Sequence, residues 1–165
     1  MKAAQFSRFG DPEVLEIVDL PDPHPGPGQV RIVVHAAGIS ATDPKLRAGT
    51  LRFGAQLPQT TGRDVAGVVD EIGEGVTDVA VGDRVFGVSD DGAGAAELAL
   101  LTFRAIIPPP SLGFVDAAGL PVALETATRA IDQLGVKAEA RCSSTAPPAG
   151  SAARPSSSPP RAARA

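Results

Sequence analysis

The sequence predicts a mainly β domain with short helices, arranged as a small, partly open β-barrel, and residues 62–87 support that prediction most directly. Val65-Ala66-Gly67-Val68-Val69 is a short β-branched run between turn signals, which is typical of a strand buried on both faces. Gly67 removes a side chain from the strand interior, and this usually marks a bulge, a bend or the close approach of another segment. Glycine turns follow at 73–75 and 82–83, and strands tightly turned around glycines favour a twisted barrel over a flat sheet.

The remaining strands are expected on both sides of this stretch. Residues 2–6 and 14–20 are expected to pair through a turn at 10–12, and residues 29–39 alternate apolar and polar side chains as a half-buried strand does. Further strands are expected at 96–101 and 105–107.

Three short helices are expected between and after the strands. Thr42 or Asp43 is expected to cap the first, with Pro44 at its first position and Gly49 beyond its end. Residues 114–118 form one or two helical turns. Pro121 then begins a helix that ends at Gly135 and places four apolar residues on one face, namely Leu124, Ala127, Ile131 and Leu134.

Length, charge and cysteine count limit the function classes. The 165 residues suit one domain, or one domain plus a fragment. The net charge of −4 combines +4 on residues 141–165 with −8 on the rest, and an acidic globular part argues against nucleic acid as a partner. Cys142 is the single cysteine, which excludes an intrachain disulfide and a multi-cysteine zinc site. With no bilayer-length apolar run and no signal peptide, we expect no membrane association and a cytoplasmic location.

The segment Gly62–Gly87, GRDVAGVVDEIGEGVTDVAVGDRVFG, resembles the GroES-like catalytic domain of the medium-chain dehydrogenase/reductase superfamily, and most of all its zinc-independent quinone-oxidoreductase branch. The resemblance extends from Met1 to about Leu134, with the motifs in family order. It implies a GroES-like catalytic domain at residues 1–120 and a linking helix at 121–135. In the family that helix leads into a nucleotide-binding Rossmann domain.

Residues 136–165 differ in composition from the rest and are expected to be a disordered Ala/Ser/Pro/Arg-rich tail, because residues 141–165 hold no aliphatic side chain larger than alanine to form a core. We hypothesise that a one-base slip near Arg141 produced this tail. Re-read one base earlier with G/C-rich codons, residues 142–159 become VLVHGAAGGVGSAAVQLA, a strand and glycine turn of the kind that holds a dinucleotide pyrophosphate. The first bases and serine codons were chosen freely, and the alternative is a genuine linker.

The zinc-binding residues of the superfamily's alcohol dehydrogenases are replaced in this chain. In those enzymes a cysteine follows the first long strand and a His-Glu pair begins a GHE motif. Here Ser40 lies in the cysteine's region and Arg63-Asp64 replaces His-Glu. Because a hydroxyl and a guanidinium are poor zinc ligands, we expect no metal at this site.

Residues 38–47, GISATDPKLR, resemble instead the zinc-independent pattern G-V-N-P-x-D-x-K, with Ser40 in place of the asparagine. The resemblance implies that Asp43 and Lys45 are catalytic residues beside the substrate cleft, and that Ser40 and Thr126 contact the cofactor. The alternatives are a helix cap for Asp43, a solvated side chain for Lys45 and an ordinary helical threonine for Thr126.

The resemblance implies hydride transfer from NADPH, or NADH, to a small quinone or conjugated enone, and a homodimer in the full-length family. The alternatives are an enoyl-thioester reductase of the same superfamily and a non-enzymatic GroES-like binding module. The reactive chemistry belongs to the nicotinamide, so a missing nucleophile–base pair does not exclude a reductase. Phosphate binding needs a glycine turn before a helix, which the tail lacks, so we expect the chain as given to be inactive.

Overall fold

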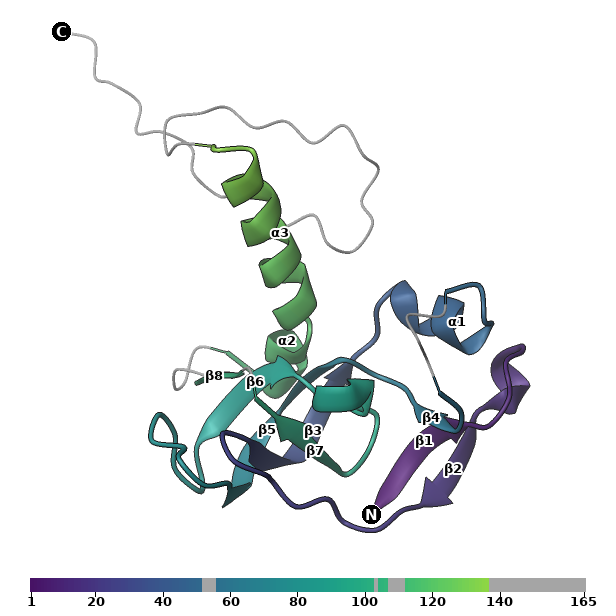
Figure 1. The fold of residues 1–165 in the computed structure, drawn as a ribbon, viewed down its shortest axis with the longest axis horizontal. Helices are drawn as coiled ribbons and strands as arrows, with labels where there is room; N and C mark the ends of the chain where they lie inside the picture. The colour runs from purple at the N-terminus through teal and green to yellow at the C-terminus, as the bar shows by residue number, and fades with distance from the viewer. Residues whose placement is uncertain (52–55, 103, 107–111, 137–165) are drawn as a thin grey trace, which may run out of the picture.

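The computed structural model of the chain describes residues 1–51, 56–102, 104–106 and 112–136. In these segments the strands form a smaller sheet of order β2-β1-β4 and a larger sheet of order β7-β3-β5-β6-β8 (Figure 1). Every strand pair in them is antiparallel, and the larger sheet curls into a half-barrel. The expected mainly β, partly open barrel is therefore confirmed.

The strand positions follow the predicted order closely. The smaller sheet consists of β1 (Lys2–Phe6), β2 (Glu16–Asp19) and β4 (Gln59–Thr60). Residues 12–14 form a 3-10 turn, η1 (Pro12–Val14), so the expected strand at 14–20 is shorter than predicted. The strands of the larger sheet are β3 (Val30–Gly38), β5 (Asp64–Ile72), β6 (Arg84–Val88), β7 (Leu98–Leu101) and β8 (Arg104–Ile106).

The β5 strand lies in the middle of the larger sheet and supplies much of the core. Val65 and Val69 are buried and pack in one cluster with Val30 and Ile32 from β3 and Leu101 from β7. Gly67 pairs with Val34 on β3, and a Cβ atom at Gly67 would collide with the backbone carbonyl of Val33. The glycine in this strand therefore permits close backbone approach, as the sequence predicted.

Helix α1 (Thr42–Arg47) forms where the sequence predicts it, but its start differs from the prediction. The N-cap position is Ala41, and Thr42 and Asp43 already lie inside the helix, with Pro44 third. The expected capping by Thr42 or Asp43 is therefore wrong. The reason is that Ser40 takes part of this role, since its Oγ accepts a hydrogen bond from the Thr42 N–H at 3.2 Å.

Two further helices connect the barrel to the C-terminal side of the described chain. Helix α2 (Phe114–Ala118) packs against β3 and β5, and α3 (Pro121–Gln133) rests on β5 and β6 through its first turns. Figure 1 shows α3 rising away from the larger sheet. Its expected apolar face is incompletely covered by the described residues, because Leu124 and Ile131 are each 42% exposed and Leu134 is 74% exposed. A short 3-10 segment, η2 (Asp90–Gly92), precedes β7.

The expected tail at 136–165, with its hypothesised change of frame, lies outside the described residues apart from Val136. None of the helices in the described segments has the length and apolar character needed to cross a bilayer.

Candidate functional site

Two hollows lie beside the segment Gly62-Arg63. The first, which we call the α1 cleft, has a volume of about 540 Å³ and lies between α1, β4 and η2. The second, the α3 cleft, has a volume of about 800 Å³ and lies between β6 and the first turns of α3. Both volumes fall in the range of ~300–1,000 Å³ that is usual for small-molecule sites.

Arg63 is common to both clefts. Besides Arg63, the α1 cleft is lined by Gln5, Phe6, Asp43, Leu46, Gln56, Pro58, Gln59, Thr60, Thr61, Gly62, Ser89, Asp91, Gly92 and Ala93. The α3 cleft is lined by Ser40, Thr42, Phe86, Gly87, Val88, Arg104, Pro121, Val122, Glu125, Thr126 and Arg129.

The structure brings the two expected cofactor residues together. Ser40 follows β3 and Thr126 lies in the middle of α3, yet both line the α3 cleft. The contact of α3 with β5 and β6 produces this arrangement, because it sets the helix beside the strand ends. The α3 cleft therefore presents two hydroxyl groups from segments that are far apart in the sequence.

Asp43 lines the other cleft and has a clear structural task. Its Oδ2 accepts a hydrogen bond from the Ser40 N–H at 2.7 Å, and its Oδ1 accepts one from the Gly62 N–H at 3.3 Å. Gly62 has a φ of +88°, and a Cβ there would lie 2.7 Å from the Ala95 nitrogen. Asp43 thus ties the start of α1 to the turn that presents Arg63.

Lys45 is exposed and lies on the lining of neither cleft. Thr126, by contrast, lines the α3 cleft. The four residues expected from the sequence therefore divide into a pair at the α3 cleft, one residue at the α1 cleft, and one outside both.

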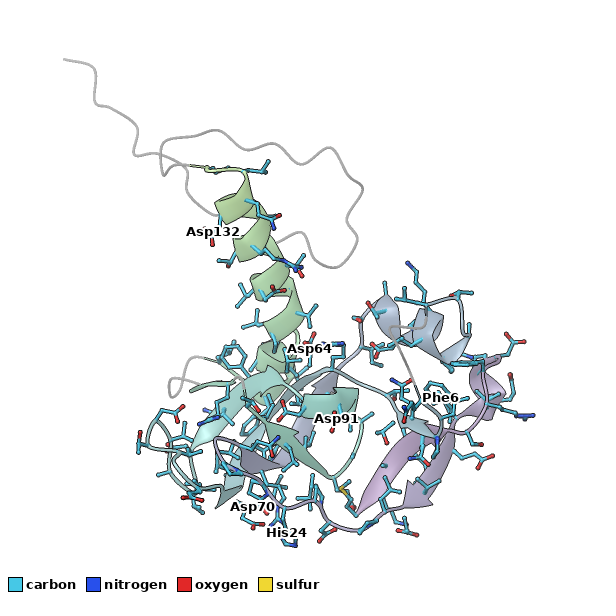
Figure 2. The ribbon with its side chains drawn as sticks, in the orientation of Figure 1. Phe6, His24, Asp64, Asp70, Asp91 and Asp132 are labelled. Carbon is cyan, nitrogen blue, oxygen red and sulfur yellow. The ribbon has the colours of Figure 1, made fainter. Side chains whose placement is uncertain are left out.

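Asp64 anchors α3 to the sheet. Its side chain is buried, and Oδ1 accepts a hydrogen bond from the Val122 N–H at 3.1 Å, at the first turn of α3. Figure 2 shows Asp64 at the base of α3. Burial raises the pKa of the Asp64 carboxyl, and the nearby Asp43 charge adds to that increase, while the Val122 hydrogen bond and Arg63 oppose it.

The position of Asp64 corresponds to the glutamate of the superfamily's GHE motif. No group of three or more His, Cys, Asp or Glu side chains lies close enough to hold a metal ion within the described segments. The Asp64 carboxylate is directed to a backbone N–H instead.

Sequence reasoning missed the role of Arg63 as a cleft residue and considered it only as a replacement for a zinc ligand. Its side chain is exposed and forms no hydrogen bond or ion pair with any of the residues that the structure describes. Sequence reasoning also missed Gln59, whose buried Oε1 has no partner in the same part of the chain and which lines the α1 cleft. Neither residue has a sequence signal, because an isolated polar residue beside a strand has no spacing pattern.

Several other polar residues of the described segments make structural contacts. His35 stacks on Phe114 with ring centroids 4.4 Å apart, and the Arg84 guanidinium lies 4.5 Å from the same ring, so these residues fasten α2 to the sheet. Glu97 accepts a hydrogen bond from the Lys2 N–H at 2.7 Å and holds the start of β1.

Comparison with known proteins agrees with this fold. The family profile of the alcohol dehydrogenase GroES-like domain matches residues 26–111, and the chain belongs to this family. Its relatives and structural neighbours are consistent with the quinone-oxidoreductase-like branch of the medium-chain dehydrogenase/reductase superfamily, of which it spans the N-terminal part.

Three relatives illustrate the match. The rat (Rattus norvegicus) quinone oxidoreductase is 40% identical over 133 residues, which are 79% of this chain and 40% of that protein. The quinone oxidoreductase from Coxiella burnetii superposes with a TM-score of 0.73 at 39% identity, over 83% of this chain and 46% of the other. The Escherichia coli quinone oxidoreductase, solved in complex with NADPH, has a TM-score of 0.74 at 25% identity, over 81% and 43%. The chain thus spans about 40% of the length of the curated quinone oxidoreductases it matches.

Proposed function

We propose that this chain provides the catalytic domain of a zinc-independent, NADPH-dependent reductase whose acceptor is a small quinone or conjugated enone. The observation that supports this most directly is that Ser40 and Thr126 line one cleft of about 800 Å³, although 86 positions separate them in the sequence. Relatives named quinone oxidoreductases, one of them solved with NADPH, supply the reaction class.

The residues of the α3 cleft fit the nicotinamide end of NADPH. The hydroxyls of Ser40 and Thr126 offer hydrogen bonds to its carboxamide, while the wall formed by Phe86, Val88 and Pro121 is suited to the flat ring of an acceptor lying beside it. NADPH held there would supply a hydride, and the acceptor would gain that hydride and one proton from water, giving NADP⁺ and the reduced acceptor. The chain's own residues hold and orient the two reactants.

Asp43 is proposed to act mainly by positioning. Its carboxylate binds the backbone N–H groups of Ser40 and Gly62, so it fixes Ser40 at one cleft and the Gly62-Arg63 turn between both. Lys45 belongs to the proposal as well: its side chain is exposed on α1, and we propose that its ammonium contacts a phosphate of the cofactor or the acceptor. A small molecule as substrate and a cytoplasmic location belong to the same proposal.

The zinc-independent part of the proposal rests on the chemistry of the residues at the zinc positions. Ser40 and Arg63 offer a hydroxyl and a cation, and the Asp64 carboxylate is directed to the Val122 N–H. Purified protein is therefore expected to contain no stoichiometric zinc by elemental analysis.

A chimera tests the proposed reaction. Residues 1–136 of this chain are joined to the part of the rat quinone oxidoreductase that follows its matched region, and oxidation of NADPH is followed by absorbance with 9,10-phenanthrenequinone as acceptor. We expect quinone-dependent oxidation that persists in the presence of a chelator. Replacing Thr126 by valine in the chimera should raise the KM for NADPH, whereas Glu16→Gln on β2 serves as a control. A folded chimera that binds NADPH but reduces no quinone would refute the proposal.

We also propose the domain division made from the sequence: a catalytic domain at 1–120, a linking helix at 121–135 and a separate segment at 136–165. The coding DNA around codon 141 tests the hypothesised slip. Restoring one base should open a frame of about another domain's length, ~150 residues. A stop codon within a few residues of the shifted frame would leave the linker alternative.

A further inference from the structure

Arg63 is a cation in an unusual setting. It follows Gly62, whose positive φ and contact with Ala95 leave the turn little freedom. The turn is also held by the hydrogen bond from the Gly62 N–H to Asp43, and the Arg63 carbonyl accepts one from the Ser89 N–H at 2.7 Å. The backbone at Arg63 is therefore fixed on both sides. Its guanidinium forms no hydrogen bond or ion pair with residues 1–51, 56–102, 104–106 and 112–136, although its charge acts on the neighbouring Asp64 carboxyl.

The other charged residues of the α3 cleft are paired. Arg104 forms an ion pair with Asp78, which lies outside the cleft, and Arg129 lies 3.3 Å from the Glu125 carboxylate. Asp64, the sequence neighbour of Arg63, forms no ion pair with it at the distances found in the structure and accepts from Val122 instead. Arg63 is thus the cation of this lining that keeps its full hydrogen-bonding capacity for a ligand.

The charge balance distinguishes the two clefts. The α3 cleft is lined by three cations, Arg63, Arg104 and Arg129, and by the single anion Glu125. The α1 cleft has two anions, Asp43 and Asp91, against Arg63 alone. An anionic ligand is therefore favoured in the α3 cleft and disfavoured in the α1 cleft.

The apolar part of the α3 cleft complements this charge. Phe86 packs against Ala66, Ala117 and Ala118, so its ring is held in place, and Val88, Pro121 and Val122 extend the same wall. A flat apolar body with one negatively charged oxygen matches such a wall beside an unpaired guanidinium.

We propose that Arg63 binds the carbonyl oxygen of the acceptor in the α3 cleft and stabilises the negative charge that this oxygen gains during reduction, so that flat molecules with an anionic oxygen bind there more tightly than neutral ones of the same shape. This inference rests on the proposed function, because the oxygen is the carbonyl oxygen of the quinone or enone that is reduced. A conjugated carbonyl compound that gains a hydride on carbon holds the displaced electron pair on its oxygen until water donates a proton. An arginine at that oxygen stabilises the charge as it develops.

Binding of two matched probes to the ¹⁵N-labelled chain tests the proposal by NMR. 2-Naphthoate has the apolar body and an anionic group, and 2-naphthamide has the same shape without the charge. We expect naphthoate to shift the amide signals of Gly87, Val88 and Thr126 and to bind about five- to tenfold more tightly than naphthamide, because a charge-assisted hydrogen bond on an exposed cation is partly screened. The preference should shrink at high salt.

The variants separate Arg63 from general charge. Arg63→Gln should make the two probes bind equally, and Arg63→Lys should retain part of the preference because it keeps the charge and loses the planar fork. Arg8→Gln is the matched control, since Arg8 is also exposed, has no partner among the described residues and lines neither cleft.

Each outcome bears on the proposal. Equal binding of the probes to the unaltered chain, a preference that survives Arg63→Gln, shifts confined to the α1 cleft, or no binding of either probe would each overturn it. The chimera assay remains separate: a chimera without quinone reduction refutes the proposed reaction, while the probe preference alone reports the anion site.

Discussion

Asp64 links the sheet to α3, and we expect its replacement by alanine to lower the free energy of unfolding but its replacement by asparagine to keep or raise it. Asp64→Ala removes the acceptor for the Val122 N–H and leaves that donor unpaired beside a buried site. We expect a loss of about 1–3 kcal/mol in the free energy of unfolding, which lowers Tm by roughly 3–10 °C for a domain of this size. Asp64→Asn keeps an oxygen acceptor at the same place and removes the charge, so it should be as stable as the unaltered chain, or more stable, at pH 7.

The pH dependence gives the sign of the charge effect. Burial raises the pKa of the Asp64 carboxyl in the folded chain, so between the unfolded pKa, ~3.9, and the raised folded pKa the folded state binds more protons. The contribution of Asp64 to stability therefore falls as the pH rises through this window. Relative to the unaltered chain, Asp64→Asn should gain stability from pH 4 upward.

Urea unfolding followed by circular dichroism from pH 4 to pH 8 measures both effects. Glu16→Gln, which alters an exposed carboxylate on β2, is the control for the loss of one negative charge. If Asp64→Asn is as destabilising at pH 7 as Asp64→Ala, the charge of Asp64 is itself needed to anchor α3 and the reasoning fails. A constant difference between Asp64→Asn and the unaltered chain across the pH range would refute the raised pKa.

Two further substitutions test the turn and the sheet. Asp43→Ala removes the acceptor of the Ser40 and Gly62 N–H groups and should lower the free energy of unfolding by about 1–3 kcal/mol, as measured by urea unfolding with Glu16→Gln again as control. A loss no larger than that of the control would mean that the two hydrogen bonds do not hold the turn. Gly67→Ala places a Cβ against the Val33 carbonyl and should cost at least about 3 kcal/mol, whereas Gly75→Ala, at a φ of +80° with open space around it, should cost about 1–2 kcal/mol. Equal losses for the two alanine variants would contradict the close approach of β3 and β5.

The sequence alone determined where most strands lie and which residues enter the core. The run Val65–Val69 is strongly β-branched and is flanked by turns, so its state depends on local propensity and burial pattern, and the structure places it at the centre of the larger sheet. Pro121 and Gly135 similarly bound α3 through the backbone preferences of single residues. The start of α1 was predicted wrongly because Ser40, Thr42 and Asp43 lie within four residues and offer several capping arrangements, and in the structure the Asp43 carboxylate also binds the Gly62 N–H.

Only the tertiary structure decided which residues form the site. Ser40 and Thr126 share a cleft because α3 packs on β5 and β6, and nothing in their local sequences specifies that contact. Asp43 binds two backbone N–H groups, and one of them belongs to Gly62, 19 positions away in the sequence. The guanidinium of Arg63 is likewise available to a ligand only because the fold places no hydrogen-bond or ion-pair partner beside it among the described residues. Local propensity acts over a few residues, so strands and helices can be predicted from a single sequence. Charge pairing and cleft shape arise from distant segments that the fold brings together, so only the tertiary structure reveals them.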